Sequence, residues 1–134
     1  MKYLHDAFLE PAPQGGRLRI AGAPEGLDAL ALATIAQGRP GGVLHVAASD
    51  MSLTAMAQAL AFFAPDLDVV TVPAWDCMPY DRVSPSSLVL SQRMAALSRL
   101  ATGSNGGRVV LTTANAAAQR LPARSTVTAA SFRA

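Results

Sequence analysis

Lysine is almost absent from this 134-residue chain, because Lys2 is the only one and arginine supplies the other ten of the eleven basic residues. Cysteine occurs once, as Cys77, which excludes an internal disulfide, and with only two histidines the chain offers no zinc-type cluster. The net charge of +2 is too small for a nucleic-acid-binding footprint. These shortages exclude a disulfide-stapled secreted domain and a structural zinc module, and they predict that no metal is bound.

Long hydrophobic runs are missing too, although 51% of the residues are hydrophobic. No stretch approaches the roughly 18 apolar residues of a membrane-spanning helix. The first residues contain Asp6 and Glu10 instead of the apolar segment of a secretory signal. Alanine accounts for 27 residues and aromatic side chains for seven, which favours closely packed helices on a sheet. Size and composition predict one domain in the cytoplasm.

Apolar residues alternate between strand and helix periodicity along the chain. This pattern predicts strands at residues 17–21, 42–48, 67–72 and 108–113, separated by helices at 26–37, 50–64, 86–101 and 114–120. Ser49 and Asp50 supply N-cap side chains for the second of these helices, and Ser86 and Ser87 can cap the third. The apolar run at 42–48 is typical of a strand covered on both faces. Strands alternating with helices imply an α/β fold in three layers, a mostly parallel sheet with helices on both faces.

The predicted domain organisation has three parts. Residues 1–16 are an N-terminal arm and linker, residues 17–122 a helicase-like or nucleotide-binding-like half-domain, and residues 123–134 a tail that starts a following domain. The arm can form a short helix over residues 1–10, with its apolar side made by Tyr3, Leu4, Phe8 and Leu9. The tail predicts a strand from Ser125 to Phe132 with nothing to complete it, which indicates a piece of a longer protein.

The loop after the first predicted strand is the expected place for a phosphate-binding site. It contains Gly22 and Gly26 but no lysine for the outer phosphates and no hydroxyl for magnesium, while Glu25 and Asp28 oppose an anionic ligand. We therefore predict a vestigial loop (Gly22, Gly26, Asp28), a degenerate domain with no catalytic residue, and no cofactor for this fragment. The alternative is a small nucleotide- or cofactor-binding α/β enzyme that uses the loop from Gly22 to Gly26.

Residues 75–85 hold the only tryptophan in a proline-stiffened segment beyond a strand end. They suit a recognition surface or a lid that folds back over the helices. The candidate interaction or lid residues are Trp75, Asp76, Pro79, Tyr80, Asp81 and Arg82. A carboxylate pair of Asp76 and Asp81 is the catalytic alternative, although turn chemistry explains both residues equally well.

Other chemistry-bearing residues have plainer interpretations. Cys77 lacks a nearby histidine and is predicted to be a buried, inert thiol, and His45 lies in an apolar strand where a core position is usual. A further hypothesis is a DNA-binding module, which predicts an affinity that falls steeply with salt. It would use Arg82, Arg93, Arg99 and Arg108.

Several of these segments carry a resemblance to a known family. Residues 72–85, Ser91-Gln92-Arg93, residues 109–115 and Gln119-Arg120 closely resemble the N-terminal region of bacterial transcription-repair coupling factors, and the resemblance runs from about Arg17 to Pro122. A weaker similarity, through Asp76, Pro79 and Pro85, links the chain to the bacterial excision-nuclease protein that recognises damage with a helicase domain.

The resemblance implies a parent protein that is an ATP-dependent DNA translocase, a helicase-like hydrolase that displaces stalled RNA polymerase at DNA lesions and recruits nucleotide-excision-repair proteins. ATP and Mg would serve its distant motor domains, and RNA polymerase and DNA would bind the rest of the parent. The present region corresponds to a module similar to that helicase-domain protein, but without a working nucleotide loop. The damage sensor of excision repair, a separate damage-recognition protein, would bind mainly to the following domain. This fragment is then a non-catalytic scaffold, with no membrane association.

Overall fold

The computed structural model describes residues 16, 21, 22, 24, 26–78, 82–104 and 106–131. The predicted arm helix at 1–10 and all but the last residue of the predicted strand at 17–21 therefore lie outside the described residues. The described elements are α2 (Leu27–Gln37), β1 (Val43–Ala47), α3 (Asp50–Phe63), β2 (Asp68–Val72), α4 (Ser87–Thr102), β3 (Arg108–Thr113), α5 (Ala114–Ala118) and α6 (Arg124–Ala130). Among the described helices, none has the length and apolarity needed to cross a bilayer.

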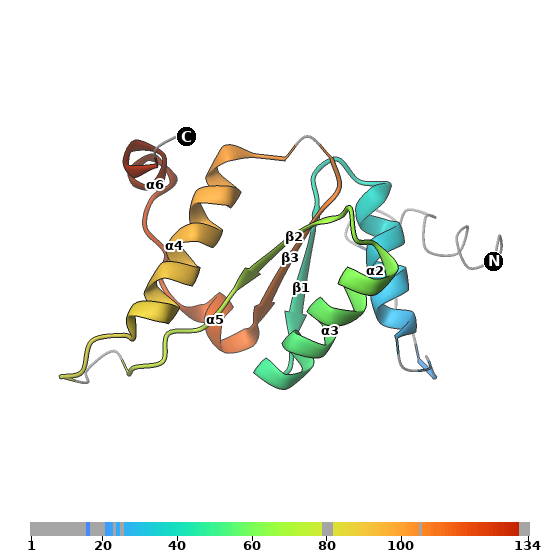
Figure 1. Cartoon of the computed structure of the whole chain (residues 1–134), viewed down its shortest axis with the longest axis horizontal. Helices are drawn as coiled ribbons and strands as arrows, with labels where there is room; N and C mark the ends of the chain where they lie inside the picture. The colour runs from blue at the N-terminus through green and yellow to red at the C-terminus, as the bar shows by residue number, and fades with distance from the viewer. Residues whose placement is uncertain are drawn as a thin grey trace.

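The described sheet is parallel and has the strand order β1-β3-β2. Val43 of β1 and Val69 of β2 both align with Val109 of the central strand β3. Helices α2 and α3 lie on one side of the sheet and α4 on the other (Figure 1). The predicted α/β fold in three layers is therefore confirmed.

The main core lies between the sheet and the pair α2 and α3. Val109 and Leu111 of β3 and Leu60 of α3 are fully buried there. Alanines fill the remaining space, with Ala29, Ala33 and Ala36 of α2 at 3% exposure or less. Such small side chains let α2 approach the sheet closely, which is what the alanine-rich composition predicts.

The opposite side of the sheet is only partly covered. Helix α4 packs on β2, where Val70 and Val72 are buried against Ala96. On β1, in contrast, Leu44 is 61% and Val46 48% exposed. Within the described ranges, residues 42–48 are therefore covered on one face only, since an apolar run indicates which strand can be covered and not which segment of the chain covers it.

The predicted helix caps are present. The Ser49 hydroxyl accepts a hydrogen bond from the Ser52 backbone N–H at 3.2 Å and the Ser52 hydroxyl accepts one from the Ser49 N–H at 3.0 Å, a reciprocal capping box for α3. The Ser86 hydroxyl accepts from the Val89 N–H at 3.3 Å at the start of α4. Side-chain capping therefore fixes where both helices begin.

The prediction of a strand at residues 125–132 is wrong, because residues 124–130 form helix α6. Val127 is buried against Leu97 and Ala101 of α4. The Arg124 guanidinium donates to the Ala101 carbonyl oxygen at 2.9 Å, joining the start of α6 to the end of α4. Packing against α4 thus overrides the alternating pattern of serine, threonine and valine in this segment.

Candidate functional site

Segments from three elements meet where the parallel strands end, which is the edge at which open α/β sheets bind ligands. Pro73 and Trp75 follow β2, Arg93 comes from α4, and Gln119 follows α5 at the end of β3. The Gln119 side-chain oxygen accepts the Trp75 backbone N–H at 2.9 Å and Arg93 Nη1 at 3.2 Å. Arg93 Nη1 also donates to the Pro73 carbonyl oxygen. We call these four residues the Arg93 cluster.

Arg93 is a buried cation, with only 1% of its surface exposed. Its guanidinium carbon lies 4.4 Å from the centre of the Trp75 ring, within the range of a cation–π interaction. Burial lowers the pKa of Arg93, but an arginine stays charged at any physiological pH. Its Nε and Nη2 find no hydrogen-bond partner in the described part of the chain. The aromatic face and neutral carbonyl groups therefore stabilise this charge.

A second contact closes the loop that carries the candidate interaction residues. The Asp76 carboxylate accepts the Ser86 backbone N–H, at 3.1 Å to one oxygen and 3.3 Å to the other. Hydrogen bonding from Ser86 lowers the pKa of Asp76. This carboxylate therefore holds both ends of the loop together, which agrees with the structural interpretation of Asp76.

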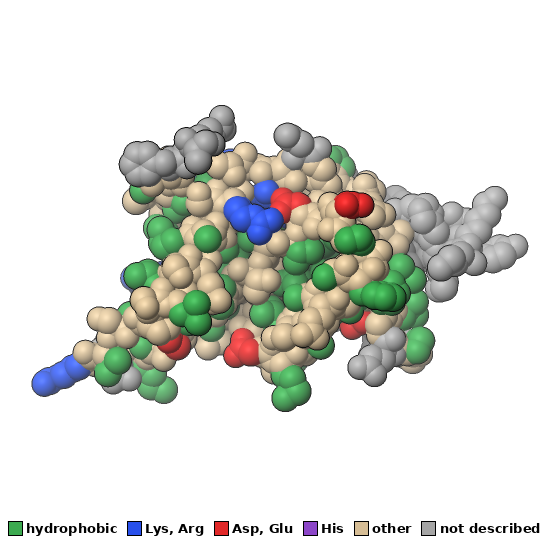
Figure 2. All heavy atoms as spheres, in the orientation of Figure 1, with side chains coloured by type: hydrophobic (Ala, Val, Ile, Leu, Met, Phe, Trp, Pro, Cys, Tyr) green, Lys and Arg blue, Asp and Glu red, His purple; other side chains and the backbone are tan. Residues whose placement is uncertain are grey.

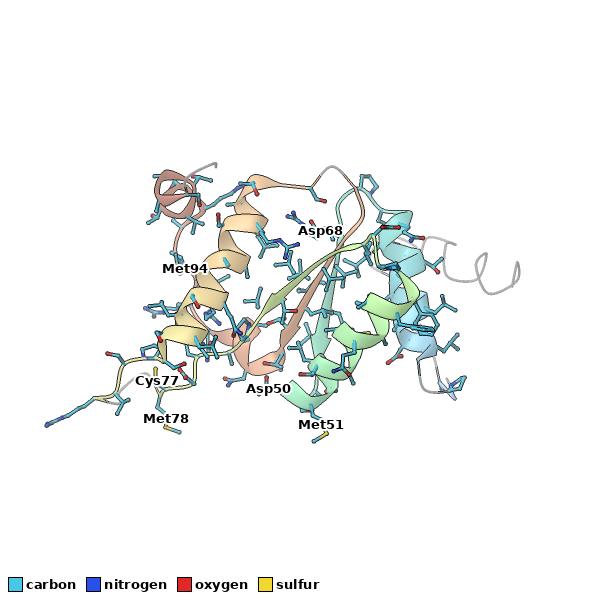
Figure 3. All side chains as sticks on the ribbon, viewed as in Figure 1. Asp50, Met51, Asp68, Cys77, Met78 and Met94 are labelled. Atoms are coloured by element: carbon cyan, nitrogen blue, oxygen red, sulfur yellow. The ribbon has the colours of Figure 1, made fainter. Side chains whose placement is uncertain are left out.

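The described residues of this loop are mostly exposed. Arg82 is exposed, Met78 is 75% and Val83 68% exposed, and Cys77 is half-buried. Figure 3 labels Cys77 and Met78 at the outer end of the molecule, near the start of α4. Trp75 contacts Arg93, whereas Met78, Arg82 and Val83 are exposed to solvent. Pro79, Tyr80 and Asp81 lie outside the described residues, so their predicted roles stay predictions.

The N-terminus of α2 follows the predicted vestigial nucleotide loop. Gly22 and Gly26 have positive φ angles of 71° and 86°, and no side chain caps the helix. The exposed Asp28 carboxylate accepts the Ala29 backbone N–H at 2.8 Å. Phosphates bind to free backbone N–H groups at the N-terminus of a helix. Here the Ala29 N–H already donates to a carboxylate of the protein itself. Glu25 lies outside the described residues.

Three of the four arginines in the DNA-binding hypothesis are engaged within the domain. Arg93 is buried in its cluster, and Arg99 and Arg108 both bind the carboxylate of Asp68. Arg108 Nε lies 2.6 Å from Asp68 Oδ2, and its other nitrogens donate to the carbonyl oxygens of Arg99 and Gly103. Figure 2 shows basic and acidic side chains side by side on this surface. These arginines join α4 to the start of β3.

The charge on Asp68 should matter for stability in a pH-dependent way. Partial burial alone would raise its pKa, but the hydrogen bond and charge of Arg108, then those of Arg99, lower the pKa below its ordinary 3.8. The carboxylate therefore stabilises the fold above about pH 4. Asp68→Asn should lower the free energy of unfolding by about 1–2 kcal/mol at pH 7.

Urea unfolding at a series of pH values checks this prediction. The difference in free energy of unfolding between the unsubstituted chain and Asp68→Asn should shrink as pH falls through the lowered pKa of Asp68. The protonated side chain no longer forms an ion pair with either arginine. Asp66→Asn is the control, since Asp66 is an exposed carboxylate two positions before Asp68. A difference that stays constant between pH 7 and pH 2 would contradict the ion-pair interpretation.

Sequence reasoning missed the contacts of the Arg93 cluster. Gln119 stands out only in the family resemblance, and Arg93 only there and in the DNA-binding hypothesis. Neither residue type in isolation indicates burial. The sequence predicts no metal centre, and within the described ranges no three His, Cys, Asp or Glu side chains lie close enough to hold an ion.

Two curated proteins are similar to part of the chain. The transcription-repair-coupling factor of Rickettsia bellii (strain RML369-C) is 36% identical over 80 residues, which is 60% of this chain and 7% of that protein. The transcription-repair-coupling factor of Rickettsia prowazekii (strain Madrid E) is 33% identical over 73 residues, 54% of this chain and 6% of that protein. The chain thus spans less than a tenth of these relatives.

No protein-family model matches the chain, and no solved structure matches it. The similarity to the two curated proteins therefore carries the relationship. More than half of the chain is therefore similar to part of two transcription-repair-coupling factors.

Proposed function

We propose that the chain is a non-catalytic α/β module of a transcription-repair coupling factor, and that it acts as a scaffold for interdomain and protein–protein contacts in transcription-coupled repair. The relationship to two such factors supports the setting. The observation that carries the non-catalytic role is the N-terminus of α2, where the Asp28 carboxylate takes up the Ala29 N–H. Residues 21–33 supply no lysine, serine or threonine for phosphate or magnesium.

The parent protein in this proposal is an ATP-dependent DNA translocase that displaces stalled RNA polymerase and recruits excision-repair proteins. Its motor would lie in the large part of the relatives that this chain does not cover. The damage sensor of excision repair would contact mainly the domain that follows. The contact surface offered by this module itself would be the exposed loop after Trp75. Met78 and Val83 offer apolar contact surface there, with the exposed Arg82 next to Val83.

Titration calorimetry with Mg-ATP tests the non-catalytic role. The full chain should show no binding heat with ATP at millimolar concentration, because no basic side chain at the start of α2 offsets Asp28. Asp28→Ala should not create a site, since the lysine and hydroxyl would still be missing. A micromolar Kd that Gly22→Ala abolishes would contradict the proposal and favour the nucleotide-binding enzyme.

The scaffold role has its own test in a longer protein that contains this segment. Met78→Ser together with Val83→Ser should leave ATP hydrolysis unchanged and slow the repair of transcribed strands. Equal effects on hydrolysis and repair would place the loop in the motor and contradict a scaffold role.

A further inference from the structure

We propose that the N-terminal arm of this chain, residues 1–10, docks as an amphipathic helix on the uncovered face of β1. The docking surface consists of Leu44 and Val46 of β1 together with Val110 and Leu100 beside them. It lies on the same side of the sheet as α4. Neither the family relationship nor the proposed scaffold role assigns an occupant to this face.

The uncovered face has the width of one helix. On this side of the sheet α4 buries Val70 and Val72 of β2, whereas Leu44 and Val46 remain 61% and 48% exposed. Helices pack about 8–10 Å apart, while neighbouring strands are about 4.8 Å apart. A second helix beside α4 therefore falls over β1, two strands away from β2. Parallel sheets are almost always covered on both faces. We therefore expect one more helix on this face of β1, in addition to those in the described ranges.

The chemistry of the arm fits this surface. Its predicted apolar side carries Leu4 and Phe8 one helical turn apart, and its polar residues include Asp6 and Glu10. A helix of ten residues is about 15 Å long, and a strand of five residues about 17 Å. A helix this short is marginal in water alone and needs an apolar surface to pack against.

The positive charge at one end of β1 determines in which direction the arm helix would run along this strand. A cavity of about 560 Å³ opens at the start of β1 and is lined by Leu44, Arg108 and Arg124, among others. The charged residues that line it are Arg108 and Arg124, with no carboxylate among the described side chains that line it, so the cavity margin is positive. A helix C-terminus carries partial negative charge, and Glu10 adds to it. The arm should therefore run antiparallel to β1, with Glu10 near Arg124.

The connections of the sheet bring the arm to this side. The chain passes from β1 to β2 through α3 on one face, and returns from β2 to β3 through α4 on the opposite face. These two crossovers have the same hand. Helix α2 lies on the same face as α3. A strand before α2 would therefore have to lie beyond the free edge of β1 for the connection through α2 to have the same hand as the other two crossovers. The linker at residues 11–16 can span about 20 Å, enough to reach over that edge.

Thermal unfolding of the full chain tests the contact between arm and strand. Leu44→Ser and Phe8→Ser should each lower Tm by roughly 4–8 °C, because each would remove an apolar side chain from the docked contact. The double variant should lose little more than either single variant, since both remove the same contact. Leu121→Ser is the matched control, since Leu121 is 55% exposed, and its effect should add to that of Phe8→Ser. Full additivity of Leu44→Ser and Phe8→Ser would overturn the proposal.

Disulfide formation in dilute solution provides a second readout. In a Cys77→Ser background, Phe8→Cys with Leu44→Cys should form a cross-link within one chain, whereas Phe8→Cys with Leu121→Cys should not. Cross-linked dimers alone would show that a second copy supplies the helix and would overturn docking within the chain. Equal cross-linking of the two cysteine pairs would overturn it as well.

Discussion

Gly107→Ala is expected to lower the free energy of unfolding by about 3 kcal/mol. A β-carbon on Gly107 would lie 2.4 Å from the Ala36 carbonyl oxygen and 2.8 Å from its carbon. Both atoms belong to the backbone of α2, so no side-chain rotation relieves the contact. The end of α2 would have to move away from the entry to β3.

Gly106→Ala is the matched control, because a β-carbon there meets nothing within 4 Å. Its effect should stay within about 0.5 kcal/mol. Urea unfolding followed by circular dichroism measures both variants. Equal losses at the two positions would mean that loop flexibility, and not the approach of α2, determines the effect.

Arg93→Ala should destabilise the fold by about 2–4 kcal/mol. The substitution removes a fully buried stem, the stacking on Trp75 and the hydrogen bonds to Pro73 and Gln119. Arg93→Met retains most of the volume but removes the charge. Because Nε and Nη2 lack partners in the described residues, this second variant should be neutral or slightly stabilising.

The fluorescence of Trp75, the only tryptophan, reports both the stability and the local environment. Denaturant titrations should give a lower midpoint for Arg93→Ala and an unchanged or higher midpoint for Arg93→Met. Both variants should alter the emission of the folded state, since each removes the cation over the ring. A loss of about 3 kcal/mol or more in Arg93→Met would mean that the charge itself is stabilising.

Most helices and strands could be predicted from residues that are close together in the sequence. Ser49 and Ser86 begin their helices as expected, because a side-chain cap depends on residues within one turn. The strands at β1, β2 and β3 follow from short apolar runs between glycine and proline. The sequence pattern predicts a strand where helix α6 forms, since a seven-residue segment depends on its packing against α4 more than on its own pattern.

The candidate site was less predictable for a physical reason. Arg93 and Gln119 are 26 positions apart and meet only because α4 packs on β2, whose end lies beside the end of β3. Trp75 and Gln119 are 44 positions apart. Sequence patterns describe periodicity within an element, so they indicated the loop after Trp75 but not the arginine under its ring.

The contact between Asp76 and Ser86 has a consequence for how this domain can change in length. The two residues are ten positions apart, and their hydrogen bonds anchor the loop independently of what lies between them. Closing a loop costs entropy that grows only with the logarithm of its length, about 0.6 kcal/mol per doubling. Extra residues inserted after Met78 would therefore leave the sheet and its helices nearly undisturbed, which makes this loop a natural point for inserting another structural unit.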